Sequence, residues 1–267
     1  MKHPAERLRE LEQRARKRFG QNFLVSHDLA ANIVSAAGVR KGERVLEIGP
    51  GLGVLTNALL AAGADVVAIE LDRDLAAVLR EDLPTIELIE GDALRVDIPA
   101  AARVVANLPY NVGTMLMLRL LPMAMPMALM FQREVAERLV ARPGTKAWGA
   151  LSVQVQARSR TEFLVELGPG AFHPPPKIRS VVVGFRPIAF DFGGVDGETF
   201  DMVVRQGFAS RRKTIENSLG QRWSKSVARA ALEQSQIDPS TRAETLDLAA
   251  WRRLAPVLGP LPPEHGR

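Results

Sequence analysis

The chain has 267 residues, of which 46% are hydrophobic and 24% charged, proportions that are ordinary for a globular protein. It contains no cysteine, which excludes disulfides, thiolate zinc sites and cysteine nucleophiles and makes a cytoplasmic location the expectation. No apolar run approaches the ~18 residues of a membrane span, and the start of the chain is too charged for a signal peptide, so no membrane association is expected.

Positive charge is concentrated in two places. The formal net charge is +5, and residues 1–20, interpreted as a basic amino-terminal arm, carry seven Lys or Arg residues against three Glu. A second cluster is Arg211-Arg212-Lys213. Such clusters indicate a polyanionic partner, most often nucleic acid, whereas a solvated helix face is the alternative for either cluster alone.

The first part of the chain alternates between short apolar strands and helical segments. Residues 19–24 are expected to be irregular, and Ser26 or Asp28 can cap a helix that runs to about Ala37. Strands are expected at Arg44–Ile48, Asp65–Glu70, Ile86–Glu90, Arg103–Ala106 and Met127–Phe131, and further helices at Val54–Ala62, Arg73–Asp82, Met115–Leu121 and Arg133–Val140. This alternation predicts βαβ units, and therefore an α/β fold with a mostly parallel sheet.

The pattern changes after Trp148. Leu151–Ala157 alternates apolar and polar residues, which favours a strand, although a helix is nearly as well supported. Strands are then expected at Phe163–Leu167 and Ser180–Phe185, followed by helices at Glu198–Ala209, Lys213–Leu219, Val227–Gln234 and Leu246–Val257. We therefore expect a larger α/β domain at residues 1–190 and a smaller helical domain at 195–267, with the boundary near 188–195.

The tetrapeptide Asn107-Leu108-Pro109-Tyr110 follows a buried strand and offers unusual chemistry. Pro109 ends the strand because proline cannot continue a sheet ladder. The Asn107 amide oxygen and the Pro109 carbonyl can accept the two protons of an exocyclic amino group, and Tyr110, the only tyrosine of the chain, can stack on the base that carries it. The alternative is a simple turn, because Asn and Pro are both common turn residues.

Three earlier strands also end in residues that suit a ligand. Gly49, in a G-x-G-x-G pattern, lets the backbone approach a ligand closely, Glu70 can bind both ribose hydroxyls, and Asp92 can accept from an adenine amine. Each has an ordinary alternative: a nicotinamide-binding turn, a solvent-facing strand end and a turn aspartate. Together with Asn107 they describe a crevice for a nucleoside without phosphates, and S-adenosylmethionine fits that description.

Several motifs resemble a known family. EIGPGLGVLT (residues 47–56), VVAIELD (66–72), GDAL (91–94) and NLPY (107–110) are similar to the Rossmann-type methyltransferases that act on adenine N6. KRFGQNFL (17–24), FQREVAERL (131–139), FHPPPKIRS (172–180), RRKT (211–214) and RAETL (242–246) narrow the resemblance to the bacterial small-subunit ribosomal RNA adenine dimethyltransferases. One departure is residues 111–115 (NVGTM), where that family's pattern has an Ile and a Pro nearby.

The resemblance implies a fold and a set of site residues. It implies a Rossmann-like S-adenosylmethionine-dependent methyltransferase domain with a smaller carboxy-terminal helical domain that binds RNA or the ribosome, and it implies no metal. The residues implied for the cofactor are Asn22, Leu24, Gly49, Glu70, Asp92 and Asn107. The residues implied for catalysis are Asn107, Pro109, Tyr110 and Phe172, with Phe172 as a second aromatic wall opposite Tyr110, although Phe172 could instead be a core residue. Lys177 and Arg179 would contact the RNA backbone.

The resemblance also implies a substrate. It implies that the protein dimethylates N6 of two adjacent adenosines in a loop near the 3′ end of 16S rRNA in the immature small ribosomal subunit, with a role in ribosome biogenesis. Separately, the absence of heptads and of an obvious apolar patch makes a monomer the expectation. Two alternatives stay open at this point. One is a related methyltransferase that acts on large-subunit rRNA or on DNA adenine, and the other is a ribosome-assembly factor whose binding matters more than its chemistry.

Overall fold

The computed structural model describes residues 22–210 and 212–259. The expected basic arm, the segment Lys17–Gln21 and Arg211 lie outside these residues. Among the residues described, no helix is both long and apolar enough to cross a lipid bilayer.

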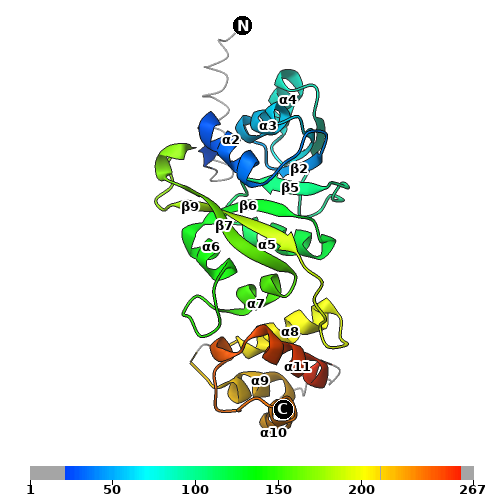
Figure 1. The fold of residues 1–267 in the computed structure, drawn as a ribbon, viewed down its shortest axis with the longest axis vertical. Coiled ribbons are helices and arrows are strands. Elements are labelled where there is room, and N and C mark those ends of the chain that lie inside the picture. Colours follow the sequence, from blue (N-terminus) through cyan, green and yellow to red (C-terminus); the bar gives the residue numbers. More distant parts are fainter. Residues whose placement is uncertain (1–21, 211, 260–267) are drawn as a thin grey trace. The chain divides into compact units, whose positions relative to one another are not determined.

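In the described part of the chain, seven strands form one mixed sheet, which confirms the expected α/β class. The strands follow the spatial order β4-β3-β2-β5-β6-β9-β7. All pairings from β4 to β6 are parallel, whereas β9 runs antiparallel to β6. Figure 1 shows β2, β5, β6 and β9 side by side. The bounds are β2 Arg44–Ile48, β3 Asp65–Glu70, β4 Glu87–Glu90, β5 Arg103–Ala106, β6 Met127–Gln132, β7 Ser159–Leu167 and β9 Ser180–Pro187.

The helices between the parallel strands begin where capping residues place them. Ser26 accepts a hydrogen bond from the Leu29 N–H, and Asp72 accepts from the N–H groups of Asp74 and Leu75, so each satisfies donors that a helix leaves unpaired at its start. The helices of this part are α2 His27–Ala36, α3 Val54–Ala61, α4 Arg73–Asp82, α5 Gly113–Leu120 and α6 Arg133–Leu139, with a 3-10 turn at Leu121–Met123. The strands and helices expected up to residue 140 are thus confirmed to within a few residues at their ends.

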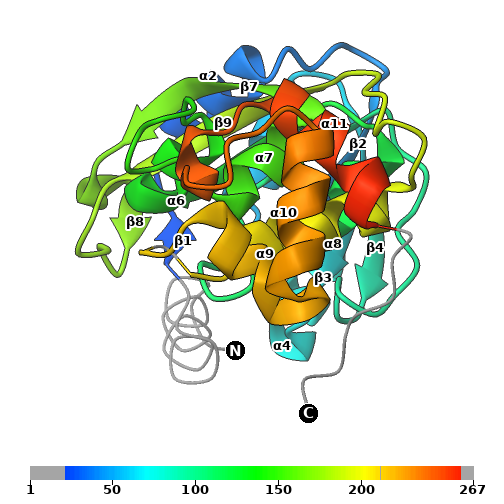
Figure 2. The same cartoon turned by 90° about the horizontal axis from the view of Figure 1, so that it is seen from below.

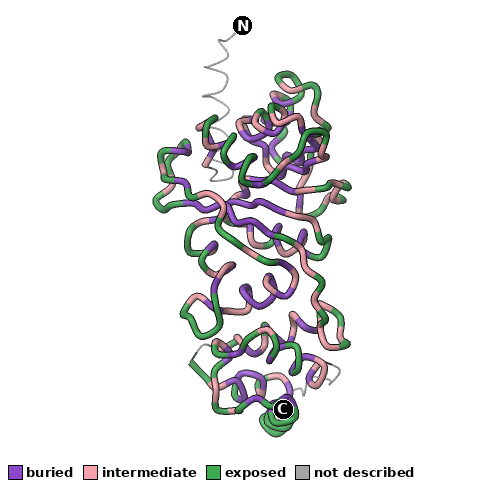
Figure 3. Tube along the Cα trace, in the orientation of Figure 1, coloured by how far each residue is buried: buried purple, intermediate pink, exposed green. Residues whose placement is uncertain are grey.

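The hydrophobic core of this part lies on the sheet. Figure 3 shows the central strands as buried. Ile33 of α2 and Leu59 of α3 pack in one cluster with apolar residues from five strands, so α2 and α3 cover one face. The strand members of that cluster are Val45, Val66, Val105, Ala128, Met130 and Val182. Parallel strands are covered on both faces in such folds, which explains why their sequences read as continuous apolar runs.

The segment expected to be irregular contains a short strand. Phe23–Leu24 forms β1 and pairs antiparallel with β8, Phe172–His173. The expectation was wrong for these two residues because their partner lies about 150 positions away in the sequence, with Leu24 opposite Phe172. A polar, glycine-broken stretch gives no local sign of such a pairing.

The chain divides into two compact units. The first contains the chain up to Ala136 together with Arg160–Pro187, and the second contains Glu137–Ser159 together with Ile188 and the residues that follow. The second unit resumes at Ile188, near the expected boundary at 188–195, and it also includes residues 137–159, which the expected division places in the first domain. The reason is packing: Trp148 and Val153 belong to the same hydrophobic cluster as Phe200 and Trp251, and the Trp148 indole N–H donates to the Leu246 carbonyl at 3.0 Å.

Residues 150–156 form a helix rather than the favoured strand. The helix is α7, Ala150–Gln156, and residues 151–155 are all buried. The alternation of apolar and polar residues misled the prediction because the polar residues are buried too. Ser152, for example, donates from its hydroxyl to the Arg138 carbonyl at 2.6 Å.

The second unit is otherwise built from the expected carboxy-terminal helices. They are α8 Gly197–Gly207, α9 Ile215–Trp223, α10 Lys225–Gln234 and α11 Leu248–Leu258. Figure 2 shows α9 and α10 side by side. Their caps are Asp196, Thr214, Ser224 and Asp247, each of which accepts a hydrogen bond from a backbone N–H of the first turn.

A substitution at Gly207 tests how tightly this helical unit is packed. A Cβ atom at Gly207 would lie 2.9 Å from Cζ3 of Trp251 and would also meet Cη2 of that ring. We expect Gly207→Ala to lower the free energy of unfolding by about 1–3 kcal/mol, because overpacking outweighs the smaller gain in helix propensity. Urea unfolding at neutral pH measures the change.

A second background serves as the control. Trp251→Phe removes the ring atoms that the new methyl group would meet, so Gly207→Ala should cost much less when added to Trp251→Phe. An equal cost in both backgrounds would contradict the proposed clash.

Candidate active site

The carboxyl ends of β2 and β5 meet at the point where the sheet reverses its order. From β2 the chain proceeds through β3 to β4 on one side, whereas β5 leads to β6 on the other. Ligands bind at such a switch point in open α/β sheets, outside the carboxyl ends of the strands. Gly49 follows β2 and Asn107 follows β5, so the topology brings these two predicted residues together.

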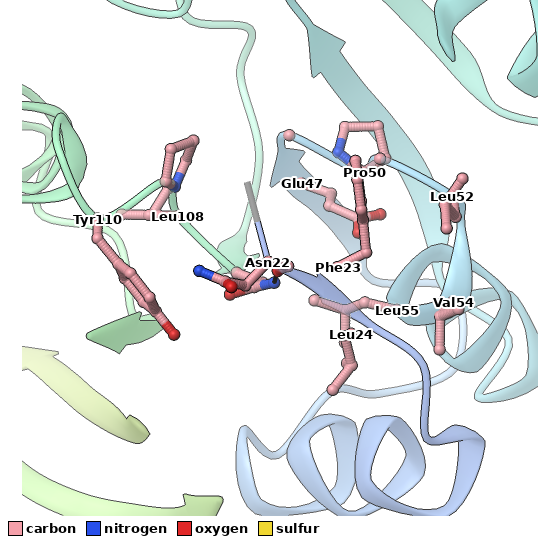
Figure 4. A pocket seen from close by; sticks show the side chains of 14 residues that line it. Asn22, Phe23, Leu24, Glu47, Pro50, Leu52, Val54, Leu55, Leu108 and Tyr110 are labelled. Carbon is pink, nitrogen blue, oxygen red and sulfur yellow. Dashed lines mark hydrogen bonds between the residues drawn. The ribbon is translucent and has the colours of Figure 1, made fainter. Parts of the chain in front are cut away.

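Two cavities flank this point. A small one of about 40 Å³ is lined by Asn22, Glu47, Asn107 and Tyr110 among others, and a larger one of about 150 Å³ is lined by Glu70 and Asp92. Gly49 and Pro109 line both cavities, so the two are neighbours. In Figure 4, Asn22 lies between Leu108 and Tyr110 on one side and Glu47 and Pro50 on the other.

The glycine loop has the backbone conformation that glycine favours. Gly49 has φ 69° and Gly51 has φ 57°, both in the left-handed region. No atom lies within 4 Å of where a Cβ of Gly49 would stand, so a side chain there would enter open space beside the cavities. At Gly51 a Cβ would meet the Phe23 ring at 3.0 Å. The loop therefore leaves room for a ligand at Gly49 and packs closely at Gly51.

Glu70 lies at the end of β3, where the sequence predicted it, but it does not face solvent. Only 1% of the residue is exposed, and its carboxylate accepts from the Gly51 N–H at 3.1 Å and from the Asp72 N–H at 2.9 Å. Burial raises the pKa of the Glu70 carboxyl, and the two backbone N–H groups oppose that rise. The alternative of a solvent-facing strand end is wrong, since this side chain braces the glycine loop from beside the larger cavity.

Asp92 opens a turn that borders the larger cavity. Its carboxylate accepts from the Leu94 N–H at 2.9 Å, which fixes the side chain within its own loop. Arg119 of α5 donates to the carbonyls of Ala93 and Val96 and so ties this loop to the helix.

Leu71, which follows Glu70, lines the same cavity and is 49% exposed. Leu71 was not predicted as a site residue, although an apolar residue directly after the strand-end acid is a signal that the sequence contains.

Asn107 and Asn22 are joined directly. The Asn107 side-chain amide nitrogen donates to the Asn22 carbonyl at 3.4 Å. That orientation leaves the amide oxygen of Asn107 available, because no donor among the described residues contacts it. Leu24 is buried in β1 and also lines the small cavity. The structure therefore brings Asn22, Leu24, Gly49 and Asn107 together as predicted.

The Pro109 carbonyl does not have the role that was predicted for it. It accepts from the Gly113 N–H at 2.8 Å and from the Val112 N–H at 3.2 Å, so both of its lone pairs are used at the start of α5. Within the described residues, no group donates to the Leu108 carbonyl, one position earlier in the same loop. Leu108 lines the small cavity and replaces Pro109 as the residue with an available acceptor.

The two aromatic residues predicted at the site differ in position. Tyr110 lines the small cavity, and its hydroxyl lies 2.7 Å from the Ser180 hydroxyl. Burial raises the pKa of the Tyr110 phenol. Phe172 is only 3% exposed, packs in the core cluster with Leu24 and Val34, and lines neither cavity. The structure does not bring Phe172 to Tyr110, and its part as a second wall stays a prediction.

Glu47 is a site residue that the sequence analysis missed. It is 1% exposed, it lines the small cavity, and no group among the described residues forms a hydrogen bond with its Oε2 atom. Burial raises the pKa of Glu47 from an ordinary 4.5 to about 8. A buried, unpaired carboxyl oxygen beside a cavity suits a cationic or hydrogen-bond-donating ligand group. An acid directly before the glycine loop was visible in the sequence and is the signal that could have found it.

Lys177 and Arg179, which were expected to contact RNA, differ in their surroundings. Lys177 is exposed, and Arg179 donates to the Glu166 carboxylate at 2.9 Å. Within residues 22–210 and 212–259, no group of three His, Asp or Glu side chains could hold a metal ion.

Sequence comparisons give the chain close relatives over nearly its full length. The family model described as "Ribosomal RNA adenine dimethylase" matches residues 12–258. "Ribosomal RNA small subunit methyltransferase A" of Pseudomonas aeruginosa is 44% identical over 264 residues, covering 94% of this chain and 97% of the relative. The protein of the same name from Thermosynechococcus vestitus is 45% identical, covering 92% and 97%.

Solved structures agree with the sequence relatives. A dimethyladenosine transferase from Plasmodium falciparum is similar with a TM-score of 0.75 and 26% identity, covering 87% of this chain and 95% of that one. The 23S rRNA methyltransferase ErmE is similar with a TM-score of 0.66 and 27% identity, covering 89% and 99%. These similarities confirm the expected Rossmann-like methyltransferase fold.

Glu47 gives a pH-dependent prediction. Because its pKa in the folded chain is raised to about 8, the folded chain holds a proton that the unfolded chain has released between about pH 4.5 and pH 8. Stability contributed by this group is therefore lost as the pH rises through that window. Glu47→Gln removes this pH dependence. The free energy of unfolding of the variant minus that of the wild type should therefore be larger at pH 8 than at pH 5.

Urea unfolding of the cofactor-free protein at pH 5, 6.5 and 8 measures this difference. Glu134→Gln, at an exposed glutamate of α6, is the matched control and should change stability equally at the three pH values. A Glu47→Gln difference that does not vary with pH would count against the raised pKa.

Proposed function

Because this chain belongs to the ribosomal RNA adenine dimethylase family, we propose that it transfers methyl groups from S-adenosylmethionine to N6 of adenines in the RNA of the small ribosomal subunit. The observation that carries this proposal is the position of the Asn107 amide. It lies in the wall of a cavity shared with the glycine loop, with its oxygen available, so a cofactor and a target amine can meet there.

The cavities fit the cofactor. The larger one has apolar walls from Ile48, Ile69 and Leu71 and a carboxylate at Asp92, which suits a flat base with an exocyclic amine. Glu70 beside it would hold the ribose hydroxyls, and the unpaired Glu47 oxygen in the small cavity suits the positively charged methionine end. When bound, S-adenosylmethionine supplies an activated methyl group on a positively charged sulfur.

The chain's own groups would activate the target nitrogen. Adenine N6 is a poor nucleophile because its lone pair is delocalised into the ring. We propose that the Asn107 amide oxygen and the Leu108 carbonyl accept the two N–H bonds of the amine, which localises the lone pair on nitrogen. Tyr110 would stack on the base and hold its plane. Catalysis then comes from positioning and from dipoles that are fixed before the reaction, without a strong base.

A second transfer follows from the same arrangement. In the first transfer the nitrogen gains a methyl group and then releases one proton to water, so one N–H remains for one of the two acceptors. Dimethylation of two adjacent adenosines, in a loop near the 3′ end of 16S rRNA in the immature subunit, is the specific proposal. The names of the relatives at 42–45% identity support the small subunit over the large subunit.

Binding of RNA is proposed for the basic residues and the helical unit. The target base must leave its stack, so an unpaired loop is the expected substrate. Lys177 and the basic cluster at residues 211–213 would contact phosphates, whereas Arg179 already has Glu166 as a partner. We propose that the protein acts as a monomer in the cytoplasm, where ribosomal subunits are assembled, and that it also contributes to their biogenesis.

Methyl transfer from labelled S-adenosylmethionine to immature small subunits tests the proposal. Naked duplex DNA and large subunits serve as parallel substrates, and nucleoside analysis identifies the product. Dimethyladenosine from small subunits alone is the expected result. Methyladenine in the DNA or in the large subunit would support the corresponding alternative, and tight binding to small subunits without any transfer would support an assembly factor.

Asn107→Ala gives the sharpest test of the mechanism. The variant should bind S-adenosylmethionine within a few-fold of the wild type and lose roughly 10²- to 10³-fold in methyl transfer, the range seen when one fixed polar contact to the reacting group is removed. Calorimetry measures the binding and the labelled-methyl assay the transfer. Asn107→Asp keeps an acceptor oxygen and is the matched control, which should retain more transfer than the alanine variant. Unchanged turnover in Asn107→Ala would remove Asn107 from the mechanism.

A further inference from the structure

Ser180 lies directly behind Tyr110. The two hydroxyl oxygens are 2.7 Å apart, so one of them donates a hydrogen bond to the other. Ser180 is 0% exposed, and within the described part of the chain this is the one hydrogen bond of either hydroxyl. The link joins residues 70 positions apart in the sequence.

Ser180 is held firmly by its surroundings. It begins β9 and stands opposite Gln132 in the antiparallel pair with β6. Next to it, the Arg133 N–H donates to the Arg179 carbonyl at 3.0 Å. The Glu166 carboxylate then accepts from both arginine side chains, at 2.7 Å from Arg133 and 2.9 Å from Arg179. The Ser180 hydroxyl is therefore attached to a strand end that is fixed on both sides.

The backbone of Tyr110 is less restrained than that of Ser180. It lies in the loop between β5 and α5, outside any helix or strand. Its ring lines the small cavity beside Asn107 and is only partly buried. Without an anchor at its far end, a tyrosine in a loop can swing about its Cα–Cβ bond between staggered rotamers. The hydroxyl of Ser180 supplies that anchor, and it does so from the strand beyond β6.

We propose that Ser180 is a positioning residue that holds the Tyr110 ring in place, with one face toward the unstacked adenine. This role rests on the proposed function. The phenol oxygen is occupied on the protein side by Ser180, so the ring face is what remains for the base. Base–aromatic stacking depends on that face being presented in one orientation. A purely structural bond between the two hydroxyls would affect stability but not turnover, and this difference makes the role testable.

The kinetic test compares Ser180→Ala, Tyr110→Phe and the double variant. Tyr110→Phe keeps the ring and removes the same hydrogen bond from the other end, so it still tests the proposal if Ser180→Ala folds poorly. Each single variant should lower turnover on immature small subunits roughly 3- to 10-fold, the range for one neutral hydrogen bond, with the KM for S-adenosylmethionine unchanged. The double variant should be no slower than the slower single variant.

Ser159→Ala is the matched control. Ser159 is a buried serine at the start of β7, and no hydrogen bond links it to Tyr110. Its replacement should leave turnover unchanged and affect stability alone.

A spectroscopic readout is available because Tyr110 is the only tyrosine in the chain. Tyrosine labelled with ¹³C at Cζ would give a single NMR signal from the whole protein, and this signal reports directly on the phenol. Ser180→Ala should shift that signal, and Ser159→Ala should not.

Three results would overturn this role of Ser180 without affecting the proposed function. An unmoved Tyr110 signal would mean that the hydrogen bond is absent in solution. A moved signal with wild-type turnover in Ser180→Ala and Tyr110→Phe would mean that the bond is structural only. Losses that multiply in the double variant would mean that the two side chains act separately. A wild-type chain that transfers no methyl groups to small subunits would overturn the proposed function itself, and this role with it.

Discussion

The parallel pairing of β2 with β5 is the constraint on which the site depends. Val45 stands opposite Arg103 and Leu46 opposite Val104, so the two strands end at the same level and their following loops meet. One of those loops is rich in glycine and the other carries the amide, the available Leu108 carbonyl and the tyrosine. A shift of this register by one residue would turn every side chain of β5 to the other face of the sheet, and the loop after it would leave the glycine loop.

The buried acids Glu47 and Glu70 show how the site is built from groups that are costly to bury. Both are 1% exposed, and burial raises the pKa of each. Glu70 offsets its desolvation with two backbone N–H groups and thereby fixes the loop that contains Gly51. In the part of the chain that the structure describes, Glu47 has no such partner at Oε2, which leaves this acceptor unsatisfied in the wall of the small cavity. Glu70 therefore mainly stabilises the glycine loop, and Glu47 is mainly available to a ligand.

Much of this arrangement follows from local sequence patterns, and the failures have a common physical cause. The strand ends at Gly49, Glu70 and Asn107 were predicted because short apolar runs followed by glycine, acid or proline are local signals. The burial of Glu70 could not be predicted, since one of its two partners, the Gly51 N–H, lies in a loop 19 positions earlier. A strand was favoured over the helix at 150–156 because the sequence does not show that a buried polar residue such as Ser152 bonds to a distant carbonyl. In each case the deciding contact is remote in sequence.

The error at Pro109 is different, because it began with a helix boundary. The sequence placed the start of the helix at Met115, which would leave the Pro109 carbonyl unused. The helix actually starts at Gly113, and its first N–H groups bond to that carbonyl. A difference of two residues in a helix boundary thus decided which of two neighbouring carbonyls is available for chemistry. Helix boundaries of that precision are beyond what capping patterns give when the first turn has no polar cap.

The short helix α5 has a consequence that reaches across the whole site. At its first turn it is bonded to the Pro109 carbonyl, and near its end Arg119 holds the carbonyls of Ala93 and Val96. The helix therefore connects the loop that would hold the target amine to the loop that would hold the cofactor's base, and it keeps them at a fixed distance. Its length, eight residues, sets the spacing between the two loops. Insertions or deletions within α5 are consequently far less tolerable than substitutions on its exposed side, even though the helix itself supplies no group to the chemistry.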